Sequence, residues 1–147
     1  MFTGSFSYNT TLHANLDEVW TLFSSAENLV RVTRFPKISL HSDPSTVKGN
    51  HLELELNFVL FRLNWRLIIL DVQAKSFFID EALRIPFPFR AWRHTHSFAQ
   101  VGESTVMTDK VEFEAYVPAL LVRLLLRGMF MDRERAIKNL LSPIKKQ

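Results

Sequence analysis

The 147-residue sequence contains no cysteine, only four glycines and only two tyrosines. Without cysteine, the chain can form no disulfide, no thiolate metal site and no cysteine nucleophile. The glycines lie far apart and build neither GxGxxG nor GxxxxGK[ST], and no G-x-S-x-G elbow is present, which argues against nucleotide chemistry and serine hydrolysis. The longest uncharged apolar runs, 67–70 and 117–122, are too short to span a bilayer. The first residues do not combine a basic segment with an apolar run, so we expect no signal peptide and a cytoplasmic protein.

What the sequence has in abundance is apolar residues. They make up 47% of the chain and include 13 phenylalanines and three tryptophans, which predicts a single core-rich domain at this length. The net charge of +3 is uneven, because residues 118–147 hold seven Lys/Arg and two acidic residues. This basic segment favours an anionic partner, such as a phospholipid surface, although a solvated helix face would have the same composition. No Arg/Lys cluster with interleaved aromatics is present, so we expect no specific nucleic-acid partner.

Periodicity predicts an α+β fold. Residues 5–13 are rich in β-formers, and Asn15 then has the character of an N-cap before a short helix that contains Leu16, Val19 and Phe23. A second short helix is expected over 26–33, and Pro118 fits the first turn of a long helix that reaches residue 141. Alternating or apolar strand signals occupy 38–42, 50–60, 64–74, 77–83, 92–101 and 105–116. We therefore expect a curved antiparallel sheet of about seven strands wrapped around a long C-terminal helix, with two short helices after strand one.

Two of these strands carry the most informative pattern. They read Trp92-x-His94-x-His96-x-Phe98 and Thr105-x-Met107-x-Asp109-x-Val111-x-Phe113, and a short turn around Gly102 joins them. A hairpin with Gly102 and Glu103 at its tip pairs positions whose numbers sum to 205. The predicted pairs are Phe98 with Met107, His96 with Asp109, His94 with Val111, and Trp92 with Phe113. One face of this hairpin then holds a histidine–carboxylate pair among large apolar groups, which we interpret as the wall of a ligand cavity.

These two strands, together with Asn15-x-Asp17-x-Val19-Trp20 after strand one and Pro118 before the last helix, resemble the START-like (SRPBCC) superfamily. This superfamily includes polyketide cyclases and coenzyme Q-binding START-type proteins, and the resemblance covers roughly residues 5–141. It implies a helix-grip fold, a single ligand-binding domain over 1–147, and a deep apolar pocket for a lipid-like or aromatic molecule. It implies no universal catalytic set, and we expect no cofactor.

His96 and Asp109 are the sharpest chemical candidates. A carboxylate beside an imidazole raises the pKa of the histidine and fixes its tautomer, which suits acid–base catalysis. A buried pair that satisfies itself and fixes the strand register would have the same sequence. His94, His96 and Asp109 also have the donor types of a metal site, but the neighbouring bulk leaves little room for metal-bound water, so we expect no metal.

The main functional prediction is binding or carriage of a hydrophobic small molecule between the sheet and the last helix. The predicted lining residues are Leu54, Leu56, Trp65, Trp92, His94, His96, Phe98, Met107, Asp109, Val111, Phe113, Leu121, Leu124 and Leu125. One alternative is a cyclase- or dehydratase-type enzyme that uses His96 and Asp109 as its acid–base pair. A second alternative is an interaction module whose basic helix, with Arg123 and Arg127 on one face, makes a weak contact with an anionic membrane surface. The protein is expected to be a monomer or a homodimer.

Overall fold

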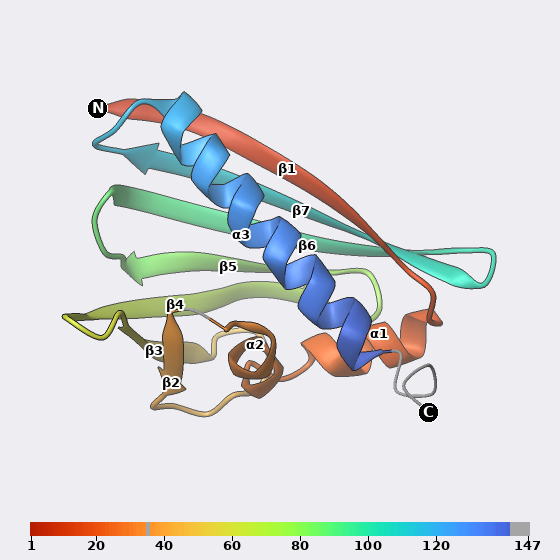
Figure 1. Cartoon of the computed structure of the whole chain (residues 1–147). Helices are drawn as coiled ribbons and strands as arrows, with labels where there is room; N and C mark the ends of the chain where they lie inside the picture. The colour runs from red at the N-terminus through yellow and green to blue at the C-terminus, as the bar shows by residue number, and fades with distance from the viewer. Residues whose placement is uncertain (35, 142–147) are drawn as a thin grey trace.

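A computed structural model of the chain describes residues 1–34 and 36–141 (Figure 1). In order, its elements are β1 (Phe2–Leu12), α1 (Leu16–Phe23), α2 (Glu27–Val32), β2 (Lys37–Leu40), β3 (His51–Asn57), β4 (Arg62–Gln73), β5 (Phe77–Arg84), β6 (Phe89–Val101), β7 (Ser104–Ala115) and α3 (Ala119–Leu140). The strands form one antiparallel sheet in the order β1-β7-β6-β5-β4-β3-β2. Figure 1 shows α3 running diagonally across one face of the sheet. The predicted α+β architecture is confirmed, although residues 142–147 of the basic segment lie outside the described chain.

Local capping explains where α1 begins. The side chain of Asn15 accepts a hydrogen bond from the backbone N–H of Glu18 at 2.9 Å, as expected for an N-cap. Asp17 and Glu18 lie in the first turn, where the helix dipole favours acidic side chains. Val19 is the fully buried contact of this helix with the interior. No helix of the described residues is long and apolar enough to cross a membrane.

The hairpin of β6 and β7 has the predicted register. Cα partners in the structure include Trp92 with Phe113, His94 with Val111, His96 with Asp109, and Phe98 with Met107. The turn residue Gly102 has a φ of +61°, in the left-handed region that favours glycine. Alternation along both strands therefore turns the tryptophan, the histidines and the aspartate into the interior, where all four are buried.

The helix face that meets the sheet differs from the prediction. The residues of α3 that are buried recur at helical spacing and are Val122, Leu126, Phe130 and Ile137. Leu121, Leu124 and Leu125 are exposed, so the prediction that they line the interior was wrong. The reason is that leucines occupy almost every angle of the first three turns. Residues further along the helix determine which face is buried, because Phe130 and Ile137 lie on the same face as Leu126.

Side chains fill most of the space between sheet and helix. Leu54, Leu56, Trp92, Val111 and Phe113 belong to one core cluster, and Trp65 packs against it. Phe98 and Met107 belong to a second cluster nearer to α1. These predicted lining residues thus pack against one another in this structure, and a role for them in ligand binding stays a prediction.

Gly4 marks a place where two elements approach too closely for a side chain. A Cβ at Gly4 would lie 2.8 Å from Cζ of the buried Phe113 ring and 3.2 Å from Cβ of Ala119. We expect Gly4→Ala to lower the free energy of unfolding by about 1–3 kcal/mol, because the core must shift to admit the methyl group. Thermal unfolding measures this as a lower Tm.

Gly128→Ala is the matched control for this substitution. A Cβ at Gly128 meets no atom within 4 Å, and the residue lies inside α3. Alanine should therefore stabilise the protein, by up to about 1 kcal/mol, through its higher helix propensity. Equal effects of the two substitutions would contradict the close packing of β1 against α3.

Candidate functional site

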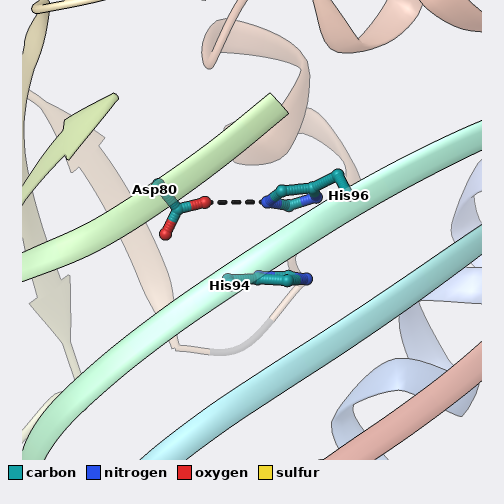
Figure 2. A group of neighbouring side chains, drawn as sticks. All are labelled: Asp80, His94 and His96. Carbon is teal, nitrogen blue, oxygen red and sulfur yellow. Dashed lines mark hydrogen bonds and ion pairs between the residues drawn. The ribbon is translucent and has the colours of Figure 1, made fainter. Parts of the chain in front are cut away.

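Five polar or charged side chains from four elements meet in the interior. Asp80 comes from β5, His94 and His96 from β6, Asp109 from β7 and Arg133 from α3. The alternation of the strands directs the first four inward, and Figure 2 shows Asp80 beside the two stacked histidine rings. We call these five residues the polar cluster.

Hydrogen bonds and one longer ion-pair contact connect the polar cluster into one network. His96 Nε2 lies 2.7 Å from Asp80 Oδ2, and His94 Nε2 lies 2.8 Å from Asp109 Oδ1. His96 Nδ1 lies 3.4 Å from the same Oδ1, and Arg133 Nη2 donates to Asp109 Oδ2 at 2.5 Å. Because a carboxylate only accepts, His94 carries its proton on Nε2 and His96 faces a carboxylate with both ring nitrogens. Asp109 thus accepts hydrogen bonds from His94 and Arg133 and lies within ion-pair distance of His96.

The predicted partnership of His96 and Asp109 is confirmed as a register pair but is not the shortest contact of either residue. Each has a closer partner, namely Asp80 for His96 and Arg133 or His94 for Asp109. The sequence carried a signal for Asp80, because it alternates with Phe78 on an otherwise apolar strand face. Arg133 also gave a signal, since it lies three residues after Phe130 on the buried stripe of α3. Both were missed because neither signal says which distant element the side chain meets.

The residues of the polar cluster shift the pKa values of one another. Burial alone would raise the pKa of Asp109, but the Arg133 guanidinium and the two histidines hold it well below its usual range. Burial alone would lower the pKa of His96, but hydrogen bonds to Asp109 and Asp80 outweigh burial and raise it. Burial and the neighbouring charge of His96 lower the pKa of His94. The network therefore favours the charged form of His96 and the neutral form of His94.

Ring stacking fixes the positions of the histidines. The His94 and His96 rings stack with centroids 3.6 Å apart, and Phe78 stacks on the other side of His96 at 3.9 Å. The Arg133 guanidinium lies 4.4 Å from the centroid of Phe130, so the charge that holds Asp109 also rests on an aromatic face. The His96 ring and the Arg133 guanidinium are thus held by aromatic contacts as well as by carboxylates.

One group of residues in the described chain has donor atoms close enough together to resemble a metal site. It consists of Asp80, His94 and His96. Their donor atoms lie within 4.8 Å of one another. The two imidazole planes differ by only 26° and are stacked, so their in-plane lone pairs do not converge on one point. Each Nε2 is also directed at a carboxylate oxygen (Figure 2 shows that of His96). This geometry favours a hydrogen-bonded network over metal coordination by these residues.

A small cavity of about 70 Å³ lies against this network. Its wall is mostly apolar. The apolar residues that line it come from α1, α2 and the strands and include Leu22, Phe23, Leu29, Val32, Leu52, Leu67, Ile69 and Phe78. Asp80, His96 and Arg133 are the charged groups in the wall, as far as the described chain shows. His96 is therefore the predicted lining residue that the structure places here. Asp80 Oδ1 is buried and has no hydrogen-bond partner among the described residues.

The opposite pKa shifts of the histidines predict a stability maximum near pH 6.5, the ordinary pKa of histidine. The pKa of His96 is raised, so its contribution is complete below that pH and is lost as pH rises through the folded-state pKa. The pKa of His94 is lowered, so its contribution is complete above that pH and is lost as pH falls through the folded-state pKa. Each limb can slope by up to about 1.4 kcal/mol per pH unit.

Urea unfolding at a series of pH values measures both limbs. We expect His96→Gln to flatten the alkaline limb and His94→Gln to flatten the limb between pH 6.5 and the lowered pKa of His94. Each variant is the control for the other, because only the shape of the profile is compared. A profile in which both variants lose the same limb would contradict the assignment of the proton to His96.

A scan against protein-family models gave no match, and neither did a search of curated proteins. Solved structures do resemble the chain. CV1439 from Chromobacterium violaceum has a TM-score of 0.77 at 10% identity, over 95% of this chain and 97% of that one. Major latex-like protein 151 from Panax ginseng gives 0.73 at 13% identity, over 96% and 99%. A START superfamily protein from Mycobacterium smegmatis gives 0.72 at 12% identity, over 93% and 96%.

These likenesses, which concern the fold, define a helix-grip architecture with a sheet gripping a long C-terminal helix. Within that class, the fold of this chain is START-like, as the sequence resemblance implied.

Proposed function

We propose that this protein binds an apolar small molecule whose polar end donates a hydrogen bond, such as a hydroxyl or an ammonium group. The observation that carries the proposal is a mostly apolar cavity that Asp80 helps to line, together with a buried oxygen of that side chain, Oδ1, that has no partner among the described residues. A mostly apolar pocket with a few convergent polar groups is the usual form of a small-molecule site. The proposal therefore rests on the site itself, and the START-like fold adds a scaffold that accommodates it.

The hydrogen-bond partners of the charged residues at the cavity indicate which polar group a ligand would carry. A buried acceptor without a partner costs about 1–3 kcal/mol, and a donor on the ligand would recover this cost. The cations at the cavity wall already lie within ion-pair distance of carboxylates, because Arg133 donates to Asp109 and His96 faces Asp80 with Nε2 and Asp109 with Nδ1. An anionic end would meet the Asp80 carboxylate without an uncommitted cation among these residues. The site thus favours donors over carboxylates or phosphates.

The size of the cavity limits what binds without rearrangement. About 70 Å³ is less than the 150 Å³ of an engineered apolar cavity that admits benzene. A lipid-like or aromatic ligand therefore requires the walls to separate, and the apolar side chains of α2, Leu29 and Val32, form one of these walls. Binding would be driven by removal of apolar ligand surface from water, at about 25 cal/mol per Å² before the costs of association.

Acid–base catalysis by His96 and Asp109 has less support. Both ring nitrogens of His96 face carboxylates, and Asp109 is fully buried and does not line the cavity. A catalytic acid or base must reach the proton that it transfers, directly or through one water. These contacts suit a structural network that presents Asp80 to a ligand.

Calorimetric titration with 1-octanol, octylamine and octanoate tests the proposal, because the three probes share a tail and differ in the polar end. We expect the alcohol and the amine to bind more tightly than the carboxylate. Asp80→Asn should remove the preference for the amine.

Leu29→Trp should fill the cavity and abolish binding of all three probes, whereas Leu125→Trp, on the exposed face of α3, is the matched control and should bind normally. Tighter binding of octanoate, or unchanged binding by Leu29→Trp, would contradict the proposed site.

A further inference from the structure

The two ends of the sheet differ sharply in the chemistry of their turns. The turn between β3 and β4, the connection between β5 and β6, and the connection from β7 to α3 lie at the end that also holds the N-terminus (Figure 1). Each of them presents large apolar side chains to solvent, namely Val59, Leu60 and Phe61, then Phe87, then Tyr116. We call these five residues the apolar tips. The turns at the opposite end, 74–76 and 102–103, consist of small, polar and charged residues.

The apolar tips protrude instead of packing into the core. Leu60 is 92% exposed and Phe87 is 72% exposed. The Phe87 and Tyr116 rings stack with centroids 6.2 Å apart, which joins the second and third connections into one apolar surface. Clustered exposed apolar groups of this size mark a contact with a partner or a membrane.

The backbone of the first turn supports a functional reason for its sequence. Val59 has a φ of +76°, a left-handed conformation that is strained for a β-branched residue. Hairpin turns that need this conformation usually contain Gly, Asn or Asp. The valine in this conformation therefore adds backbone strain, and the almost fully exposed leucine that follows it lowers the solubility of the protein. Contact of these side chains with an apolar phase would offset that cost.

The charges around the apolar tips identify the partner. The stretches 57–62, 84–90 and 115–121 contain no acidic residue, whereas Arg62, Arg84 and Arg90 flank the tips. Of these three, Arg62 also lies 3.6 Å from the Glu55 carboxylate on β3. Apolar projections flanked by cations are complementary to a bilayer with an anionic headgroup layer. A second copy of the chain fits less well, because a symmetric contact through this end would bring the arginines of both copies together without a carboxylate from these stretches.

We infer that this end of the molecule docks on an anionic phospholipid bilayer, with Val59, Leu60, Phe61, Phe87 and Tyr116 inserted at the interface and Arg62, Arg84 and Arg90 facing the headgroups. The inference does not depend on the proposed ligand. The cavity is lined by α1, α2 and the second half of α3, whereas the docking surface is formed by the strand turns at the N-terminal end.

Flotation with vesicles of phosphatidylcholine mixed with phosphatidylglycerol tests this inference, with pure phosphatidylcholine vesicles in parallel. We expect the protein to float with the mixed vesicles, to bind the neutral vesicles more weakly, and to be released by added salt. The double variant Leu60→Ser/Phe87→Ser should bind the mixed vesicles about tenfold less, because two apolar side chains no longer leave water. Both positions are exposed, so the fold should survive, which circular dichroism checks.

Val101→Ser, at the opposite end of the sheet, is the matched control because it also removes an exposed apolar side chain. It should bind as the unmodified protein does. Failure of the unmodified protein to float with mixed vesicles would overturn the inference, and so would equal binding by Leu60→Ser/Phe87→Ser. A dimer in light scattering that this double variant converts to a monomer would assign the surface to a second copy instead.

Discussion

Replacing Arg133 by methionine is expected to lower the free energy of unfolding by about 3–5 kcal/mol. Asp109 is fully buried, and Arg133 donates to its Oδ2 at 2.5 Å, so the substitution leaves a buried carboxylate without its main counter-charge. Methionine keeps an unbranched apolar side chain at this position, so the loss chiefly reports the missing guanidinium. Urea unfolding at neutral pH measures the change.

The comparison variant is Arg127→Met, on the exposed surface of the same helix. It should change the free energy of unfolding by no more than about 0.5 kcal/mol. Arg133 holds the pKa of Asp109 low, so the cost of Arg133→Met should shrink in acid as Asp109 takes up a proton in the variant. Should Arg133→Met be too unstable to study, Arg133→Met/Asp109→Asn removes both charges and should recover part of the loss. Equal stability of Arg133→Met and Arg127→Met would contradict the network.

The second large effect concerns the face of α3 that is buried. Leu126→Ala should cost about 2–5 kcal/mol, because this leucine is only 1% exposed and its removal leaves a cavity. Its neighbour Leu125 is 48% exposed, and Leu125→Ala should change stability by less than about 1 kcal/mol. Thermal and urea unfolding of the two variants compare them directly. The reverse order would mean that α3 is rotated on the sheet.

The hairpin of β6 and β7 shows how far sequence reasoning reaches. Strict alternation and a short turn with Gly102 determine both which side chains face inward and which positions are opposite, because the side-chain period of a strand is two. The pairs Trp92–Phe113 and His96–Asp109 were therefore predictable. The order of the elements was predictable for the same reason, since each strand and helix carries its own local signal.

The side chains of α3 and β5 show where that reasoning stops. Apolar residues surround the first turns of α3 on nearly every side, so the sequence does not show which face is buried. Packing against the sheet selects Val122 and Leu126. The meetings of Asp80 with His96 and of Arg133 with Asp109 join residues far apart in sequence, and no local period encodes such pairs. The volume of the cavity is also a property of how α1, α2 and α3 pack together, which a pattern in one segment does not contain.

The helices that line the cavity differ in how firmly they are attached to the rest of the protein. This difference bears on how a ligand would enter. Two side-chain hydrogen bonds attach helix α3 to the sheet: Arg133 donates to Asp109, and Tyr8 donates to Glu134. Helix α2 has only six residues, and its N-cap Ala26 makes no side-chain hydrogen bond. Swinging α2 outward would thus break neutral contacts and leave the buried ions paired. If the cavity opens, we therefore expect α2 to move while α3 and the polar cluster stay in place.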